Sequence, residues 1–299
     1  MLKVENITKY YGNLKAVDNF SFTVNEGEIF GLLGANGAGK TTTFRIIMGL
    51  LEPNEGSVSL FDQPIDYNVT DKIGFLTEER SLLLKMTVRE LILFYGNLKG
   101  MNNNEILDKL KYWLDRFNIS GYMDRKIQEL SKGNQQKIQF ISAIINDPKL
   151  LILDEPFAGL DPLNVELFKS VIKDFKKKGT IIIFSTHRME HVEEFCEKLV
   201  ILVEGRSVLE GYLKDIKRKF LRKNVFISGD IKKEDLLKID GVVDVIYNNR
   251  EYEVKIKDNT VVTTLFKTIS KCDKVTKFVV EEPSLNEIFI AKVGEAYEK

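Results

Sequence analysis

The chain has 299 residues, of which 43% are hydrophobic and 29% are charged, and these values predict a folded protein with room for two domains. Lysine and arginine together number 44, as do aspartate and glutamate, so net charge gives no general attraction to nucleic acid or to an anionic membrane surface. No apolar run reaches the ~20 residues of a membrane-spanning helix, and the amino terminus lacks the pattern of a signal peptide, so we expect a cytosolic protein.

The first segment has the pattern of a small sheet. Alternating apolar and polar residues predict strands over 2–7 and 20–24, with a turn at Tyr10, Tyr11 and Gly12 between them. An exposed aromatic residue at this place either stacks on a purine ring or packs on the small sheet. Tyr11 is the candidate under both interpretations.

A glycine-rich loop at residues 34–42 lies between an apolar run at 29–33 and a helix-like segment at 40–51. It has the Gly-x4-Gly-Lys-Ser/Thr pattern, in which backbone N–H groups and the start of the helix bind a polyphosphate. Lys40 is expected to reach the β- and γ-phosphates, and the Thr41 hydroxyl to ligate Mg²⁺. The pattern arises by chance in about one such chain per hundred, so a structural glycine turn is the weaker interpretation. The expected nucleotide-binding residues are Gly34, Asn36, Gly37, Gly39, Lys40, Thr41 and Thr42.

Strands are expected next at 57–60 and 73–76, followed by a polar loop that contains Glu78. Apolar residues at helical spacing predict helices over 88–99 and 105–117, and hence a largely helical subdomain. Its single tryptophan, Trp113, is expected to pack in the core.

A further helix is predicted to begin after Ser131 and to run to Ile145. Ser131 is a good N-cap, and Gly133 keeps the first helical turn bare. Such a helix start either binds an anion or is an ordinary capped helix.

The continuous apolar run at 150–153 ends in Asp154 and Glu155, as expected of a buried parallel strand that brings acids to the carboxyl edge of a sheet. Asp154 is placed to hold Mg²⁺ through water, and Glu155 to accept a proton from an attacking water. Two acids at a strand end are also found as plain surface charge, but the phosphate loop upstream favours the catalytic interpretation. Asp161 and Pro162 are expected to start the next helix.

The next buried strand is expected at 180–185, with His187 just past its end at the same edge. His191, on the following helix among glutamates, is expected at the surface. Cys196 and Cys272 lie far apart in the sequence, and buried free thiols are expected rather than a disulfide.

Together these motifs resemble, in order and spacing, the ATP-binding subunit of an ABC transporter over about the first two thirds of the chain. The resemblance implies an α/β fold, with a P-loop ABC ATPase domain at 1–212 whose mixed sheet is flanked by helices and whose helical subdomain covers about 82–146. The resemblance also implies the following roles: Walker A at residues 34–42, the end of Walker B at Asp154, catalytic base at Glu155, D-loop at 158–161, switch histidine at His187 and adenine-stacking aromatic at Tyr11.

In that family two subunits pair head to tail, so the resemblance implies that Ser131, Gly133 and Asn134 of one subunit close over the γ-phosphate held by the other. The usual Leu-Ser-Gly-Gly-Gln signature reads Leu-Ser-Lys-Gly-Asn here, and Asn134 retains a hydrogen-bond donor. The glutamine that normally touches Mg²⁺ after strand 73–76 is replaced by Glu78, an alternative Mg²⁺ ligand that adds negative charge beside the triphosphate.

These variants resemble the ABC-2 type exporters of the sodium, drug or peptide efflux group. The resemblance implies ATP and Mg²⁺ as cofactors, a separately encoded integral membrane subunit and a second ATPase subunit, which is either another copy or a paralogue. It also implies a cytoplasmic position, peripheral on the inner face of the membrane, and no nucleic-acid partner.

From residue 213 the pattern changes to short elements in the order strand, helix, strand, strand, helix, strand, which predicts a small α+β, ferredoxin-like domain at 213–299. Regulation, dimer support and a passive structural role are all open for it. The alternative function for the whole chain is a soluble ABC-type ATPase that acts on ribosomes or DNA. Such translation factors usually carry two cassettes, and the DNA-repair relatives carry a long coiled coil between the Walker motifs. This sequence has neither feature.

Overall fold

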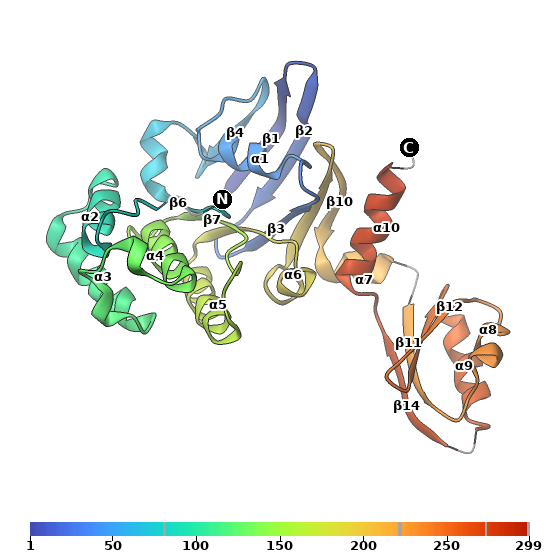
Figure 1. Cartoon of the computed structure of the whole chain (residues 1–299). Coiled ribbons are helices and arrows are strands. Elements are labelled where there is room, and N and C mark those ends of the chain that lie inside the picture. Colours follow the sequence, from blue (N-terminus) through green and yellow to red (C-terminus); the bar gives the residue numbers. More distant parts are fainter. Residues whose placement is uncertain (80–81, 221–222, 273, 298–299) are drawn as a thin grey trace. The chain divides into compact units, whose positions relative to one another are not determined.

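The computed structural model describes residues 1–79, 82–220, 223–272 and 274–297 (Figure 1). The chain forms two compact units, Met1–Glu210 and Gly211–Lys299. Within the described ranges no helix is both long enough and apolar enough to cross a membrane.

The first unit begins with an antiparallel sheet in the order β2-β1-β4-β5. Its first hairpin is longer than the sequence pattern predicts, because β1 continues through Tyr10 and Tyr11, and Tyr11 pairs with Leu14. The turn lies at Gly12 and Asn13, so the turn predicted at Tyr10, Tyr11 and Gly12 was right for Gly12 and wrong for the two tyrosines, which belong to β1. The strands of this sheet are β1 (Leu2–Tyr11), β2 (Leu14–Val24), β4 (Glu55–Leu60) and β5 (Gln63–Pro64).

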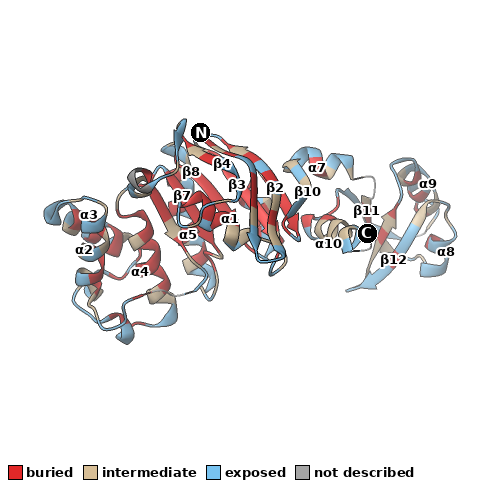
Figure 2. Ribbon diagram, turned by 90° about the horizontal axis from the view of Figure 1, so that it is seen from above, coloured by how far each residue is buried: buried red, intermediate tan, exposed pale blue. Residues whose placement is uncertain are grey.

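A six-stranded sheet in the order β10-β9-β3-β8-β7-β6 forms the centre of the first unit. The pairs β6–β7, β7–β8, β3–β8 and β3–β9 are all parallel, so their carboxyl ends meet at one edge. Figure 2 shows β3, β7 and β8 as largely buried. The strands are β3 (Ile29–Gly34), β6 (Ile73–Leu76), β7 (Leu150–Asp154), β8 (Ile181–Ser185), β9 (Lys198–Val203) and β10 (Arg206–Tyr212).

Three helices follow strands that end at this edge, one each after β3, β7 and β8. They are α1 (Lys40–Ile47), α5 (Pro162–Lys177) and α6 (Met189–Phe195). Asp161 caps α5 by accepting the N–H of Asn164 at 3.0 Å, and Pro162 occupies its first turn, which confirms the predicted start of this helix.

A helical subdomain gathers beside β6 (Figure 1). It contains α2 (Val88–Leu98), α3 (Asn103–Arg116) and α4 (Lys132–Ile144), with the short 3₁₀ turns η2 (Ser120–Tyr122) and η3 (Ile127–Glu129). A third 3₁₀ turn, η1 (Tyr67–Lys72), directly precedes β6. The aromatic side chains of the subdomain pack against α5: Phe140 stacks on Phe168 at 4.7 Å and Trp113 on Phe175 at 6.1 Å between ring centroids. The packing role predicted for Trp113 is confirmed.

The second unit contains a four-stranded antiparallel sheet in the order β12-β13-β11-β14. With helices after its first and third strands, this is the predicted ferredoxin-like arrangement. Val225, Val254 and Leu265 are fully buried in its core. The elements are α7 (Leu213–Lys219), β11 (Lys223–Gly229), α8 (Lys233–Leu237), β12 (Val242–Asn248), β13 (Glu251–Ile256), α9 (Thr260–Ile269), β14 (Val275–Glu281) and α10 (Leu285–Tyr297). Both cysteines are free thiols; Cys196 is buried, whereas Cys272 is only partly so.

Candidate nucleotide-binding site

The glycine-rich loop connects the end of β3 to the start of α1, as predicted. Gly39 has a φ of 105°, and a Cβ atom there would lie 2.5 Å from the carbonyl oxygen of Ala16. A Cβ atom at Gly34 would lie 2.6 Å from the carbonyl oxygen of Leu202. Both positions therefore require glycine, which lets the loop pack closely against its neighbours and leaves Asn36 and Gly37 exposed.

Lys40, the first residue of α1, folds back across this loop. Its Nζ donates hydrogen bonds to the carbonyl oxygens of Gly34 at 2.8 Å and Ala35 at 3.2 Å. Burial lowers the pKa of Lys40, an effect that the nearby carboxylates of Asp154 and Glu155 oppose. The ammonium group thus lies inside the loop, beside the exposed hydroxyl-bearing residue Thr41.

Asp154 ends β7 and is only 9% exposed. The Ser185 hydroxyl, directly opposite on β8, donates a hydrogen bond to its carboxylate. Burial raises the pKa of Asp154, and the charges of Glu78 and Glu155 add to this effect, while Ser185 and Lys40 oppose it. A buried carboxylate among like charges attracts a cation, so the donor chemistry of this edge suits a divalent metal.

Glu155 and His187 are brought into direct contact. Glu155 has a left-handed backbone, with a φ of 50°, and its Oε1 lies 2.8 Å from His187 Nδ1 while accepting the backbone N–H of His187 at 2.6 Å. Its Oε2 accepts the hydroxyl of Thr186 at 2.9 Å. The sequence placed both residues at one edge, but their contact and the role of Thr186 were missed. The available signal was the parallel register, which places the ends of β7 and β8 side by side.

The predicted helix start at Ser131 is confirmed. The Ser131 hydroxyl accepts the N–H of Asn134 at 3.3 Å, and a Cβ atom at Gly133 would have no neighbour within 4 Å. In the described part of the chain, the hydrogen bonds of this segment stay within the segment itself. These residues therefore present an open helix N terminus rather than joining the glycine-rich loop of their own chain.

Tyr11 and Glu78, the remaining candidates, are both exposed. Tyr11 is 45% exposed at the end of β1, so its ring is not part of the core. Glu78 follows β6, and its charge acts on both Lys40 and Asp154. Glu78 thus belongs to the same charged cluster.

His191 is buried, at 8% exposed, so the surface position predicted for it was wrong. Its ring packs edge-on against Phe157 at 4.7 Å between centroids, and Nε2 makes no hydrogen bond within the described ranges. The glutamates around His191 suggested an exposed position, but Phe195, one turn further along α6, is buried on the same face.

We expect the burial of His191 to make stability depend on pH. Burial, with the charges of Arg188 and Lys169, lowers the pKa of His191 below 6.5, while Glu190 and Glu194 oppose the shift. As the pH falls, the unfolded chain therefore binds a proton at this histidine before the folded chain does. The contribution of neutral His191 to the free energy of unfolding is fully present above about pH 6.5 and is lost as the pH drops through the folded-state pKa. The unfolding temperature should fall by a few degrees between pH 7 and pH 5.5.

A His191→Gln variant, which titrates nothing at this position, should lose that part of the pH dependence. Equal pH dependence in the parent and in His191→Gln would contradict the assignment.

A buried parallel strand, a phosphate-binding loop, a helix N terminus and two strand-end acids at one sheet edge define a P-loop ATPase cassette. Residues 17–158 match the family model described as ABC transporter, and residues 211–293 match that of the ATP-binding protein DrrA1-3-like, C-terminal domain. The chain is 49% identical over 298 residues to the uncharacterized ABC transporter ATP-binding protein YhaQ of Bacillus subtilis, with 100% of both chains covered.

The chain is also 35% identical over 213 residues to the Nod factor export ATP-binding protein I of Sinorhizobium fredii, covering 70% of this chain and 62% of that one. Among solved structures, it resembles the dimeric post-hydrolysis state of the ATP-binding cassette MJ0796 bound to ADP and Pi. The TM-score is 0.65 and the identity 26%, over 71% of this chain and 99% of that one. The protein belongs to the ATP-binding subunits of ABC transporters and is an ATPase, which confirms the resemblance inferred from its motifs.

Proposed function

We propose that this chain powers an ABC exporter, by dimerising around two Mg-ATP and driving a separate membrane-spanning subunit. The observation that carries the proposal is the contact between Glu155 and His187 at the sheet edge where Lys40 lies. The similarity to the Nod factor export ATP-binding protein I supports the export direction, and the similarity to the dimeric MJ0796 structure supports the pairing.

In this proposal each side chain at the edge has one task. Lys40 neutralises charge on the β- and γ-phosphates, together with the amides of the glycine-rich loop. Glu155 accepts the proton of the attacking water, and Thr186 orients its carboxylate through the hydrogen bond to Oε2. His187, held by the other carboxylate oxygen, positions the water and the γ-phosphate.

The residues present fit a magnesium ion that arrives with the nucleotide. Within the described ranges no group of three or more His, Cys, Asp or Glu side chains is arranged to hold a metal. Mg²⁺ is typically held by one or two carboxylates, phosphate oxygens and waters. Thr41, Asp154 and Glu78 supply hard oxygen donors of this kind. When bound, Mg²⁺ would neutralise charge that develops between the β- and γ-phosphates.

The open helix start at Ser131 supports the dimer. Ser131, Gly133 and Asn134 form a bare, capped N terminus, which is suited to bind phosphate oxygens. Since this terminus makes no hydrogen bond to its own glycine-rich loop in the described residues, we assign it to the γ-phosphate held by a second subunit. Tyr11, exposed at the end of β1, is the proposed stacking surface for adenine.

The exporter assignment is tested by isolating the tagged full chain from detergent-solubilised native membranes and identifying bound proteins by mass spectrometry. We expect to recover a polytopic membrane protein in stoichiometric amount. Its recovery would also support a peripheral position of this chain on the cytoplasmic face of the membrane. Recovery of ribosomes or DNA-bound factors instead, with the chain free of membranes, would favour the soluble ATPase alternative.

Replacing Glu78 by glutamine should leave Mg-ATP binding nearly unchanged. The amide oxygen of glutamine remains a ligand for Mg²⁺, and the change removes a negative charge beside the triphosphate. We expect the Kd for Mg-ATP, measured by titration calorimetry, to change by less than a factor of about three. A large loss of affinity would show that Glu78 has a different role.

A further inference from the structure

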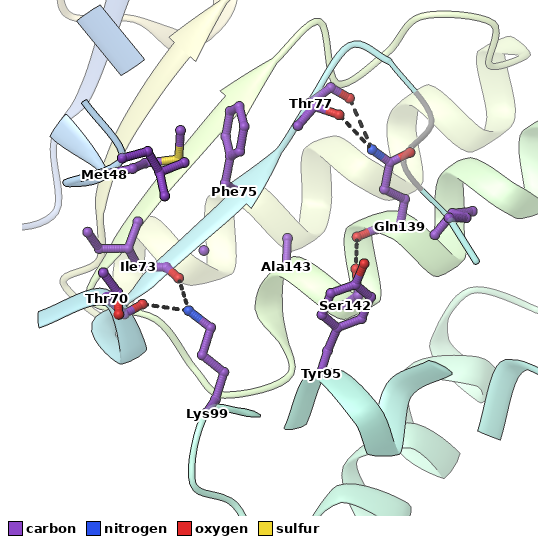
Figure 3. Close-up of a pocket in the computed structure, with 13 residues that line it drawn as sticks. Met48, Thr70, Ile73, Phe75, Thr77, Tyr95, Lys99, Gln139, Ser142 and Ala143 are labelled. Carbon is purple, nitrogen blue, oxygen red and sulfur yellow. Dashed lines mark hydrogen bonds between the residues drawn. The ribbon is translucent and has the colours of Figure 1, made fainter. Parts of the chain in front are cut away.

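The side-chain amide of Gln139, which is buried on helix α4, forms hydrogen bonds to the turn that carries Glu78. Gln139 of α4 is 5% exposed, and its Nε2 donates hydrogen bonds to the carbonyl oxygen of Thr77 at 3.2 Å, the hydroxyl of Thr77 at 3.1 Å and the carbonyl oxygen of Glu79 at 3.1 Å. Figure 3 shows the amide pointing at Thr77. Because carbonyl oxygens only accept, the atom that faces them must be the NH₂ group. The backbone is thus held on both sides of Glu78.

A second contact holds the other end of the same strand. Lys99, which follows α2, donates from Nζ to the carbonyl oxygens of Thr70 and of Ile73, the latter at 3.0 Å. Ile73 begins β6, so Lys99 holds the start of this strand and Gln139 the turn after its end. Both residues line the same cavity of about 310 Å³ between β6 and the helical subdomain (Figure 3). The path of β6 toward Glu78 therefore depends on the helical subdomain.

Packing alone does not account for an amide at position 139. The Oε1 atom of Gln139 is buried and has no hydrogen-bond partner within the described residues. An unsatisfied buried acceptor costs about 1–3 kcal/mol. An apolar side chain of the same length would fill the space without that cost. Position 139 therefore requires glutamine for its NH₂ group, which donates hydrogen bonds to the turn.

Gln139 also connects two parts of the proposed nucleotide site. It lies about two turns from Ser131 on the same helix, while the turn it holds presents Glu78 to the cluster of Lys40 and Asp154. We propose that Gln139 is a positioning residue that sets the place of Glu78, and through it the metal dependence of ATP binding. This inference rests on the proposed role of Glu78 as a Mg²⁺ ligand.

The test compares the Kd for ATP in Mg²⁺ with that in EDTA, because binding linkage makes this ratio a measure of metal binding. A Glu155→Gln background prevents turnover. In a Gln139→Met variant we expect the Kd in EDTA to stay the same and the Kd in Mg²⁺ to weaken about tenfold, as is typical when the support of a metal ligand is removed. Ser142→Ala is the matched control, since the Ser142 hydroxyl donates to the backbone carbonyl of Gln139 and not to the turn that carries Glu78 within the described residues, and it should change neither Kd.

A double-mutant cycle shows whether Gln139 acts through Glu78. In a Glu78→Ala background, Gln139→Met should cause no further Mg²⁺-specific loss. Equal weakening in Mg²⁺ and EDTA, no weakening at all, or a loss that persists without Glu78 would each overturn the proposal.

Further measurements distinguish an error in this inference from misfolding of the variant and from an error in the proposed metal role of the site. If the methionine variant does not unfold cooperatively, Gln139→Asn, which keeps the amide but shortens its reach, should show the same Mg²⁺-specific loss, and a normal ratio there would overturn the proposal. If the parent itself binds ATP equally well in Mg²⁺ and EDTA, the proposed metal role of the site is wrong, and the inference falls with it. If the parent binds ATP more tightly in Mg²⁺ than in EDTA and Gln139→Met keeps the same ratio, the inference about Gln139 is wrong while the proposed metal role of the site stands.

Discussion

Replacing Glu155 by glutamine is expected to lower the rate of ATP hydrolysis by a factor of about 10²–10⁴, the usual contribution of a general base. Glutamine has the same shape, and its amide oxygen can still accept the backbone N–H of His187, which lies 2.6 Å from Glu155 in the parent. It cannot take a proton from water at neutral pH. Phosphate release under saturating Mg-ATP measures the loss.

The same Glu155→Gln variant should still bind ATP and should accumulate as an ATP-bound dimer, detected by size-exclusion chromatography with light scattering. Glu166→Gln is the matched control, because Glu166 is an exposed glutamate of α5 whose partner is Lys169, and it should hydrolyse at the parental rate. Sustained turnover by Glu155→Gln would remove the assigned role of Glu155.

Replacing Lys40 by methionine should weaken ATP binding by about 10²-fold. Hydrogen bonds to charged groups contribute about 1.5–3 kcal/mol each, and methionine keeps the length of the side chain without the charge. Among the described residues the Lys40 ammonium group donates to two carbonyl oxygens of the loop, those of Gly34 and Ala35, and these weak neutral acceptors let it turn to a phosphate. The loss of affinity is measured by calorimetry with a non-hydrolysable ATP analogue.

Lys176→Met is the control for this change, since Lys176 pairs with Glu197 at 2.7 Å at the end of α5. It should bind the analogue as the parent does. If Lys40→Met bound the analogue as tightly as the parent, the phosphate-binding assignment of the glycine-rich loop would be contradicted.

The sequence predicts the buried strands and the loop well, because their signals are local. The apolar run before Asp154 is typical of a buried parallel strand. Gly34 and Gly39 of the loop occupy positions where a side chain has no room. The order of elements in the second unit follows from the same alternation of short patterns. Strand β2 begins six residues earlier than predicted, at Leu14 rather than Phe20, because pairing with β1 and not local alternation fixes its start.

The contacts that complete the site depend on register and packing between distant segments. The hydrogen bond of Thr186 to Glu155 requires β7 and β8 to end at the same level. The bonds of Gln139 to the turn at Thr77 join a helix to a strand end that lies far away in the sequence. The burial of His191 depends on which face of α6 meets Phe157. None of these follows from a pattern within one segment.

The measurement that tests the central claim most directly is the steady-state rate of Mg-ATP hydrolysis per chain over a wide range of protein concentration. If two chains complete each site, with Ser131 of one facing the phosphates held by Lys40 of the other, the rate per chain should rise with concentration and then level off. A constant rate per chain in the range where light scattering shows only monomer would contradict the account, as would the absence of Mg²⁺-dependent hydrolysis.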